Sequence, residues 1–311
     1  MNTPILYPRL ALIGCGLIGS SIARAAREAG VVGEIVIADA SEAARQTIAE
    51  LKLAEHVTGD IREAVAGADL VIFATPVLAI ADAADAAAGA YKAGATISDV
   101  GSVKSAVAEA LRARTDDSVF VIPGHPIAGT EHSGPAAGFA ELFKGRWTIL
   151  TPQERDDAPY LDAVGKLAAF WRSLGSQVEL MEEKHHDLVL AVTSHLPHLI
   201  AYNIVGTAAD LEEVTESEVM RYSASGFRDF TRIAASDPTM WRDIFLTNKD
   251  AVLEMLGRFT EDLQALSRAI RWGEGDKLHE LFTRTRAIRR GIIDMGQDSA
   301  ESNFGRDRGK H

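Results

Sequence analysis

The amino-acid sequence predicts an α/β fold in which a doubly wound, mostly parallel sheet is followed by an all-α helical domain. A glycine-rich turn separates a strand-like run from a helix-like run near the N-terminus, and strand-like and helix-like runs then alternate up to residue 181. Beyond that point only long helical periodicity is found. The predicted domains are residues 1–181 and 182–297, and the polar, aperiodic tail over residues 298–311 is expected to be disordered.

Composition narrows the class of protein. The 311 residues, 47% of them hydrophobic, suffice for two domains with cores of their own. Cys15 is the one cysteine, so no intramolecular disulfide is possible, which suits a reducing compartment. The apolar run before Cys15 is shorter than the about 7–15 residues of an export signal, and no uninterrupted apolar run approaches the roughly 18 residues of a membrane span. With a net charge of −12 and dispersed basic residues, we expect a soluble cytoplasmic protein without nucleic-acid or membrane partners.

A GxGxxG pattern formed by Gly14, Gly16 and Gly19 lies between a strand-like run, residues 9–13, and a helix-like run, residues 20–29. Gly14 would allow a tight turn, Gly16 would let the backbone approach a pyrophosphate, and Gly19 would let helix and strand pack closely. The N-terminus of the helix supplies amide donors and the positive end of a dipole. The pattern therefore indicates a Rossmann-like, dinucleotide-binding domain, with a glycine-rich turn of another α/β protein as the alternative.

The cofactor expected from this pattern is NAD. A second strand-like run, residues 34–38, ends in Asp39, 20 residues after Gly19, and the Asp39 carboxylate would accept hydrogen bonds from the adenosine ribose. Because a carboxylate repels a 2′-phosphate, NADP is less favoured. The rest of the expected cofactor site is the first turn of the helix and a turn at a later strand end, namely Leu17, Ile18, Thr75 and Pro76.

Three strand ends are expected to line one crevice, after residues 69–74, 96–99 and 119–122. The last is followed by a loop with Gly124, His125 and Pro126. An imidazole titrates near neutral pH, so His125 could take a proton from a substrate hydroxyl without a metal, although a loop histidine bonded to its own turn is the alternative. Ser102 could cap the next helix or contact a substrate. For Lys104, a solvated lysine in the first turn of that helix is slightly favoured over a substrate contact.

The helical half carries histidines and arginines. Its predicted helices span residues 183–211, 216–224, 226–235, 238–269 and 275–296. His195 and His198 lie at i and i+3 on one helix face, where they could pack, hydrogen-bond or contact a ligand; two histidines are too few for a catalytic zinc, so no metal is expected. The acidic and histidine-rich run 182–187 is interpreted as a solvated first turn. Arg228 and Arg232, at i and i+4, suit a carboxylate, although spacing alone favours an exposed ion-pair lattice.

Together, five segments closely resemble the prephenate/arogenate dehydrogenase family of tyrosine biosynthesis, with likeness over about residues 9–290. The segments are Gly14-x-Gly-x-x-Gly19, Asp99-Val-Gly-Ser-Val-Lys104, Gly124-His-Pro-Ile-Ala-Gly-Thr-Glu131, Ser194-His-Leu-Pro-His198 and Gly226-Phe-Arg-Asp-Phe-Thr-Arg232. The resemblance implies that His125 is the proton acceptor, that Ser102 contacts the substrate hydroxyl, and that Arg232 holds a substrate carboxylate. It also implies a homodimer through the helical half and places further residues at the border of the active site, namely His198, Thr130, Glu131 and Trp241. Arg228 stands where relatives often carry lysine, so its role stays open.

The implied reaction is NAD-dependent oxidative decarboxylation of prephenate and/or arogenate to 4-hydroxyphenylpyruvate and/or tyrosine. Hydride passes from C4 to NAD, the hydroxyl proton passes to His125, and loss of CO₂ makes the ring aromatic. The two substrates share every reacting group, so the sequence does not choose between them. We expect no fused mutase or regulatory domain before residue 9 or after residue 296. The alternatives are a non-catalytic dinucleotide-sensing protein and a β-hydroxyacid-type dehydrogenase, whose chemistry generally needs a lysine that the setting of Lys184 does not suggest.

Overall fold

The computed structural model describes residues 4–130, 132–215 and 225–294. The chain divides into two compact units, Met1–Leu253 and Glu254–His311. The first unit contains the sheets and the helices that position the candidate site. The second unit contains most of one long helix and the helix that follows it.

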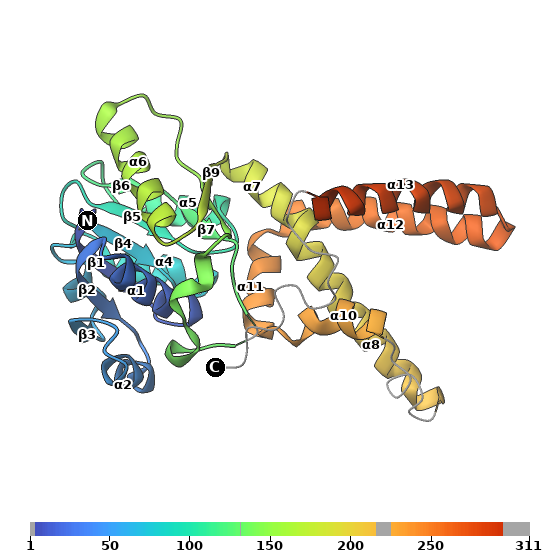
Figure 1. The fold of residues 1–311 in the computed structure, drawn as a ribbon, viewed down its shortest axis with the longest axis horizontal. Helices are drawn as coiled ribbons and strands as arrows, with labels where there is room; N and C mark the ends of the chain where they lie inside the picture. Colours follow the sequence, from blue (N-terminus) through green and yellow to red (C-terminus); the bar gives the residue numbers. More distant parts are fainter. Residues whose placement is uncertain (1–3, 131, 216–224, 295–311) are drawn as a thin grey trace. The chain divides into compact units, whose positions relative to one another are not determined.

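The central sheet of the first unit has six parallel strands in the order β3-β2-β1-β4-β5-β6 (Figure 1). The strands are β1 (Tyr7–Ile13), β2 (Val32–Ala38), β3 (His56–Thr58), β4 (Leu70–Phe73), β5 (Thr96–Asp99) and β6 (Phe120–Val121). This is the strand order of a Rossmann fold, in which ligands bind beyond the carboxyl ends of the strands, where the direction of winding reverses. Here the reversal lies between β1 and β4, which confirms the predicted fold class.

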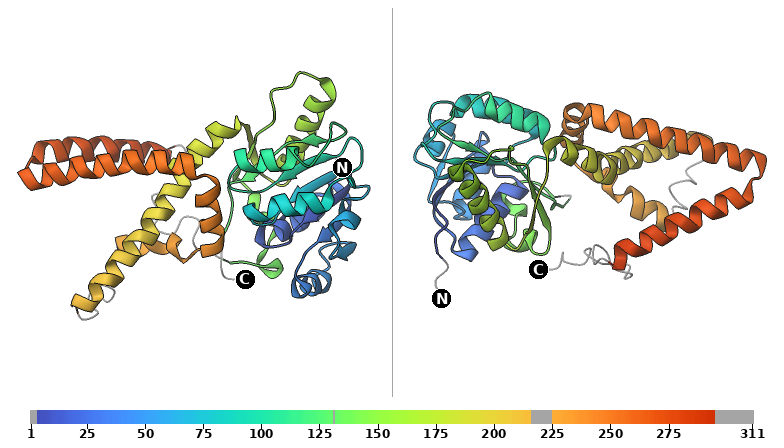
Figure 2. Two further views of the ribbon diagram at one scale, coloured as in Figure 1. Left: turned by 180° about the vertical axis from the view of Figure 1, so that it is seen from behind. Right: turned by 90° about the horizontal axis from the view of Figure 1, so that it is seen from above.

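Helices cover both faces of this sheet (Figure 2). They are α1 (Leu17–Ala29), α2 (Glu42–Glu50), α3 (Ile61–Val65), α4 (Ile80–Ala87), α5 (Ser105–Arg112) and α6 (Ala158–Ser173). Short 3₁₀ turns are η1 (Val77–Ala79), η2 (Pro135–Ala137) and η3 (Ala140–Phe143). No element was predicted between residues 40 and 68, where α2, β3 and α3 lie. These elements are short, and α2 buries one residue, Ile48.

Alternate side chains of the strands enter two separate cores. In β1, Leu10 and Leu12 pack into a cluster with Trp171 of α6, whereas Ala11 and Ile13 enter a second cluster on the other face of the sheet. Because successive residues of a strand point to opposite faces, a fully buried strand needs apolar residues at every position. The run of aliphatic residues in β1 meets this need, and all four side chains are almost completely buried.

A second, three-stranded sheet contains β7 (Gly124–Pro126), β8 (Trp147–Leu150) and β9 (Gln177–Leu180). Strand β7 is antiparallel to β8, and His125 pairs with Ile149. The expectation of a loop around His125 was therefore wrong, because the backbone after β6 enters a short strand of a different sheet. This pairing fixes the backbone of His125, from which the imidazole extends.

The helical part of the first unit begins directly after β9. Its elements are α7 (Glu183–Leu190), a π-helical turn η4 (Ala191–His195), α8 (Leu196–Thr215), α10 (Ser225–Thr231), a 3₁₀ turn η5 (Arg232–Ala235) and α11 (Pro238–Thr247). The helix predicted over residues 183–211 contains the π turn, which the periodicity did not reveal. Such turns are frequent at functional sites. The predicted segments 216–224 and 298–311 lie outside the described residues.

The helix predicted over residues 238–269 is two helices. Asn248 interrupts the predicted helix with φ −104° and ψ 29°, between α11 and α12 (Lys249–Trp272). In the second unit, α12 leads through a turn at Gly273, with φ 67°, into α13 (Gly275–Asp294). Within the described chain, one helical stretch, Glu183–Asp210, is long and apolar enough to cross a membrane by length and composition alone. The apolar 18-residue part of this stretch is 28% buried inside the protein.

Candidate active site

The glycine-rich loop after β1 has a geometry that only glycine satisfies at two positions. Gly14 has φ 88°, and a Cβ there would lie 2.9 Å from the carbonyl oxygen of Ala74. A Cβ on Gly19 would lie 2.5 Å from the carbonyl oxygen of Gly14. By contrast, a Cβ on Gly16 would meet nothing within 4 Å, in front of an α1 N-terminus that no side chain caps. The loop thus packs tightly against the protein and leaves open space where a pyrophosphate would lie.

Other predicted cofactor residues surround this loop. Asp39 accepts hydrogen bonds from the backbone amides of Cys15 and Ser41, both at 2.9 Å, which ties the end of β2 to the loop. A carboxylate has about four acceptor positions, so capacity remains for a ribose hydroxyl. After β4, the hydroxyl of Thr75 is buried without a hydrogen-bond partner among the described residues, and Pro76 precedes η1. Leu17 and Ile18 form the half-buried first turn of α1. This donor and acceptor set fits a dinucleotide.

The imidazole of His125 belongs to a buried chain of three side chains. Its Nδ1 lies 2.9 Å from Nε2 of His186, and Nδ1 of His186 lies 2.9 Å from Oδ1 of Asp187. His186 and Asp187 belong to the first turn of α7 and are 0% and 5% exposed. The interpretation of residues 182–187 as a solvated turn was therefore wrong for these two residues, because they point into the protein toward β7.

Asp187 also caps the helix that follows Ser102. Its carboxylate accepts from the backbone amides of Lys104 and Ser105, at 2.7 and 2.9 Å, at the N-terminus of α5. Ser102 does not take this capping position, which leaves its half-buried hydroxyl without a hydrogen bond to any residue that the structure describes. The capping alternative for Ser102 was therefore wrong, and the hydroxyl is available to a ligand.

Lys104 is completely buried, so the expectation of a solvated lysine was also wrong. Its ammonium donates to Oδ2 of Asp99 and, at 2.6 Å, to the carbonyl oxygen of Gly124. Asp99 in turn accepts from the amides of Gly101 and Gly124, at 2.7 and 3.1 Å. Buried charges of this kind are retained only when paired and fully hydrogen-bonded. The pair joins the end of β5 to the residue that precedes His125, and so fixes both strand ends.

Burial and neighbouring charges shift the pKa values of the three side chains, His125, His186 and Asp187. Burial lowers the pKa of His125 well below its usual value of 6.5, and the charges of His186, Lys104 and His195 lower it further. Burial also lowers the pKa of His186, although Asp187 opposes that shift. Asp187 has a lowered pKa in the balance between burial, which raises it, and its hydrogen bonds from His186 and Ser105. At neutral pH the chain therefore consists of two neutral imidazoles and a carboxylate.

The second group of histidines surrounds Trp241. His198 stacks on the indole at 3.6 Å between ring centroids, and His195 meets the same indole edge to face at 6.0 Å. Trp241 is 6% exposed and packs with Val103, which follows Ser102. The Trp241 group is thus attached to the strand end that carries Ser102.

The predicted arginines differ in their surroundings. Arg232, at the start of η5, is exposed and close enough to His198 for its charge to lower the pKa of that imidazole, after burial as the larger cause. Arg228 in α10 is exposed, and among the described residues no contact joins it to the histidines. Thr130 is exposed and accepts a hydrogen bond from the amide of His132 at 3.2 Å. Glu131 lies outside the described residues.

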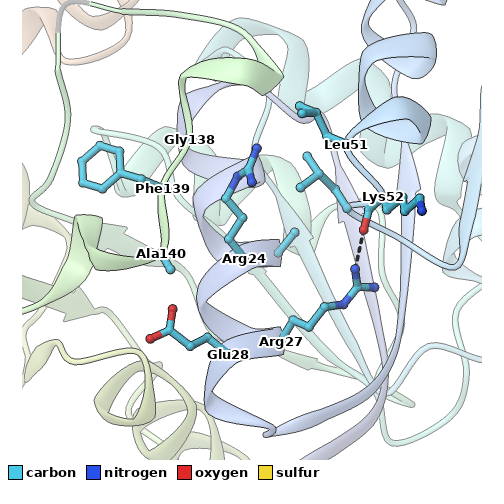
Figure 3. A pocket seen from close by; sticks show the side chains of 10 residues that line it. Arg24, Arg27, Glu28, Leu51, Lys52, Gly138, Phe139 and Ala140 are labelled. Atoms are coloured by element: carbon cyan, nitrogen blue, oxygen red, sulfur yellow. Dashed lines mark hydrogen bonds between the residues drawn. The ribbon is translucent and has the colours of Figure 1, made fainter. Parts of the chain in front are cut away.

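A pocket of about 580 Å³ lies elsewhere, beside α1, and contains none of the predicted site residues (Figure 3). Arg24 and Arg27 of α1 line it together with Lys52 and the segment around Phe139. Arg27 donates to the carbonyl oxygen of Lys52 and pairs with Glu55 at 2.5 Å. Arg27 is thus engaged with groups beside the pocket, and the residues predicted to carry the chemistry lie elsewhere, around His125.

Sequence reasoning missed His186, Asp187, Lys104 and Asn248 as members of the site. One signal was available for His186: it lies four residues before Leu190, so both occupy the buried face of α7. For Asn248 the sequence offers no comparable signal, because its partner Asp187 is 61 positions away. Lys104 has one partner nearby, Asp99, but its other partner, Gly124, is 20 positions away.

The fold and the glycine-rich loop define the class of the protein, a dinucleotide-dependent oxidoreductase. Residues 22–180 match the nucleotide-binding domain of prephenate dehydrogenase, and residues 182–284 match its dimerization domain. The chain is 43% identical to the cyclohexadienyl dehydrogenase of Zymomonas mobilis over 284 residues, which cover 91% of this chain and 96% of that protein. It is 32% identical over 290 residues to the prephenate dehydrogenase of Bacillus subtilis, covering 91% and 76%.

A solved structure agrees with these relatives. The prephenate dehydrogenase of A. aeolicus, in complex with hydroxyphenyl propionate and NAD⁺, has a TM-score of 0.84 at 32% identity and covers 92% of this chain and 98% of that one. The chain therefore belongs to the prephenate dehydrogenase family and is an oxidoreductase that acts on a cyclohexadienyl substrate.

Proposed function

We propose that the protein catalyses the NAD-dependent oxidative decarboxylation of prephenate and/or arogenate, and that Nε2 of His125 accepts the proton of the substrate hydroxyl. The observation that carries this proposal is the hydrogen-bonded chain from His125 through His186 to Asp187. The chain determines which nitrogen of His125 is free to act as a base.

The position of each proton in this row of hydrogen-bonded side chains can be worked out from the carboxylate of Asp187. The ionised Asp187 only accepts, so Nδ1 of His186 must carry the proton that it donates. Nε2 of the neutral His186 is then an acceptor, and Nδ1 of His125 must be the donor at 2.9 Å. Nε2 of His125 consequently holds a lone pair and forms no hydrogen bond with any residue that the structure describes. It is ready to accept a proton.

The chain also accommodates the charge that forms on proton transfer. When His125 becomes cationic, its Nδ1–H donates to His186, which Asp187 orients and polarises from the other side. The lowered pKa of His125 keeps the imidazole neutral before the reaction, so that the base form is present at neutral pH. Positioned general-base help of this kind is worth about 10²–10⁴-fold in rate.

The remaining groups orient the substrate. The free hydroxyl of Ser102 follows the strand end that Lys104 and Asp99 fix, and would contact the substrate hydroxyl. Arg232 would hold the side-chain carboxylate at the exposed side of the site, close to His198. When bound at the glycine-rich loop, NAD supplies the acceptor for the hydride from C4. The carboxylate of Asp39 favours NAD over NADP because it repels a 2′-phosphate.

We further propose a cytoplasmic homodimer that forms through the helical half. Several large apolar side chains of α8, α12 and α13 are 40–73% exposed in the isolated chain, namely Ile204, Leu263, Ile270, Trp272, Phe282 and Ile288. Large apolar side chains exposed in this number are typical of helices that pack against a partner. A second copy would cover these side chains, and it would also account for the apolar but poorly buried window of Glu183–Asp210.

Initial-rate assays that cross prephenate and arogenate with NAD and NADP test the proposal. His125→Asn is the informative variant, because its amide can still donate toward His186 but offers no basic nitrogen. Its turnover should fall about 10²–10⁴-fold while NAD and substrate binding stay within a few-fold. Full turnover by this variant would reject the assignment of the base. No turnover by the wild type would favour a dinucleotide sensor. A β-hydroxyacid dehydrogenase has no support in the site, since Lys184 is exposed.

A further inference from the structure

A buried asparagine sets the protonation of a second histidine. Asn248, 5% exposed at the break between α11 and α12, places its side-chain nitrogen 2.9 Å from the backbone oxygen of Asp187 and 3.1 Å from Nδ1 of His195. The backbone oxygen only accepts, so the amide group, and not the amide oxygen, must face it. The second amide hydrogen then points to His195, whose Nδ1 must be the acceptor. Neutral His195 therefore carries its proton on Nε2.

This proton has no partner in the described structure. His195 is 0% exposed, and its Nε2 is buried without a hydrogen bond to any described residue. Nε1 of Trp241, whose ring lies edge to face with the imidazole, is likewise buried without a described partner. An unpaired buried N–H destabilises the folded state, and folded proteins rarely leave such groups without a partner. Two neighbouring donors without an acceptor indicate a ligand group that only accepts.

We infer that His195 and Trp241 donate hydrogen bonds to the ring carboxylate of the cyclohexadienyl substrate, and that Asn248 positions His195 by fixing its tautomer. This inference rests on the proposed function. The groups of the substrate that only accept hydrogen bonds are its two carboxylates and, in prephenate, the ketone of the side chain, which lies next to the side-chain carboxylate. The side-chain carboxylate is assigned to the exposed Arg232, which leaves the ring carboxylate for the buried donors beside His125.

The chemistry of the leaving group agrees with neutral donors. The bond from the ring to the carboxylate carbon breaks, its electron pair remains in the ring that becomes aromatic, and the carboxylate departs as neutral CO₂. A cation would stabilise the carboxylate of the bound substrate more than the transition state, in which that charge is being lost. Burial holds the pKa of His195 at about 4, so the ring stays an uncharged donor at neutral pH. Uncharged donors orient the carboxylate without stabilising the bound substrate more than the transition state.

The test compares two ligands. One is the cyclohexadienyl substrate that the enzyme turns over, called the diene below; the other is the aromatic product of the same reaction, which lacks the ring carboxylate and keeps the side chain. His195→Leu removes the donor and should lower the apparent affinity for the diene, as KM, about 10- to 100-fold. The inhibition constant of the product should stay within about twofold. His195→Gln carries an amide near the position of Nε2 and should recover most of the loss. His185→Leu, the same change at an exposed histidine of α7, is the matched control and should behave as wild type.

Equal losses of affinity for diene and product, or no loss for the diene, would overturn the inference. The proposed function fails separately, if the wild type turns over neither diene or if His125→Asn keeps full activity. The tautomer has its own readout: in spectra of ¹⁵N-histidine-labelled protein, His195 should show a protonated Nε2 and an unprotonated Nδ1. Asn248→Asp, which can only accept, should reverse the two and weaken the diene alone. A protonated Nδ1 in the wild type would contradict the role of Asn248.

Discussion

Mild acid should destabilise the folded protein through its buried histidines. His195 has a pKa of about 4 in the folded state, against about 6.5 when it is exposed in the unfolded chain. Between these values the unfolded chain binds a proton that the folded protein does not, so the free energy of unfolding falls as the pH is lowered from about 6.5 to about 4. The effect is absent above pH 6.5, where the ring is neutral in both states.

The magnitude follows from the width of this window. A shift of one pKa unit corresponds to about 1.4 kcal/mol, so His195 alone should remove about 2 kcal/mol of stability at pH 5 and about 3 kcal/mol in full. His125 and His186 have lowered pKa values as well and add to the loss in the same direction. For a protein of ordinary stability, about 5–15 kcal/mol, this is a substantial part of the total.

Urea unfolding at constant ionic strength, followed by tryptophan fluorescence at pH 7 and pH 5, measures the loss. His195→Gln is the control, because it removes the titrating ring and keeps a hydrogen-bonding side chain. The variant should lose about 2 kcal/mol less than the wild type between the two pH values. The reasoning is refuted if the wild type is equally stable at pH 5 and pH 7, or if the variant shows the full wild-type loss.

Three further predictions follow from single contacts. Asp187→Ala leaves the donors of His186, Lys104 and Ser105 without an acceptor and should lower the free energy of unfolding at pH 7 by several kcal/mol, at about 1–3 kcal/mol per buried donor; a loss below about 1 kcal/mol in urea unfolding would contradict it. Gly19→Ala places a methyl group 2.5 Å from the carbonyl of Gly14 and should raise the dissociation constant of NAD at least tenfold in fluorescence titrations, with unchanged affinity as the contrary result. Asp39→Ser should lower the ratio of kcat/KM for NAD over NADP at least tenfold; an unchanged ratio would show that another group selects the cofactor.

The sequence was sufficient for the architecture of the nucleotide-binding part. The glycine-rich loop and the end of the next strand depend on a local strand, turn and helix. Neighbouring residues therefore determine the geometry at Gly14, Gly16, Gly19 and Asp39. The alternation of strands and helices then limits the sheet to a few topologies. The location of His125 beyond the central sheet was predicted for the same reason, but its short strand was missed because its partner, Ile149, is distant in the chain.

The chemistry of the candidate site was less accessible because it depends on contacts between distant segments. His186 is 61 positions from His125, and Lys104 is 83 positions from the carboxylate of Asp187 that accepts from its amide. A charged pattern such as Glu-Glu-Lys-His-His-Asp usually indicates a solvated turn, and only the packing of α7 distinguishes its buried members from its exposed ones. The break at Asn248 was not predicted, because the residues on both sides of it are helical.

The proposed base, His125, and the residues that orient it belong to different segments of the polypeptide. His125 lies in the segment that matches the nucleotide-binding domain, whereas His186 and Asp187 open the segment that matches the dimerization domain. A chimaera that joins the cofactor half of one relative to the helical half of another must therefore preserve this junction. A graft that loses it would still carry every glycine of the dinucleotide loop, yet its histidine would have no fixed tautomer with which to begin the reaction.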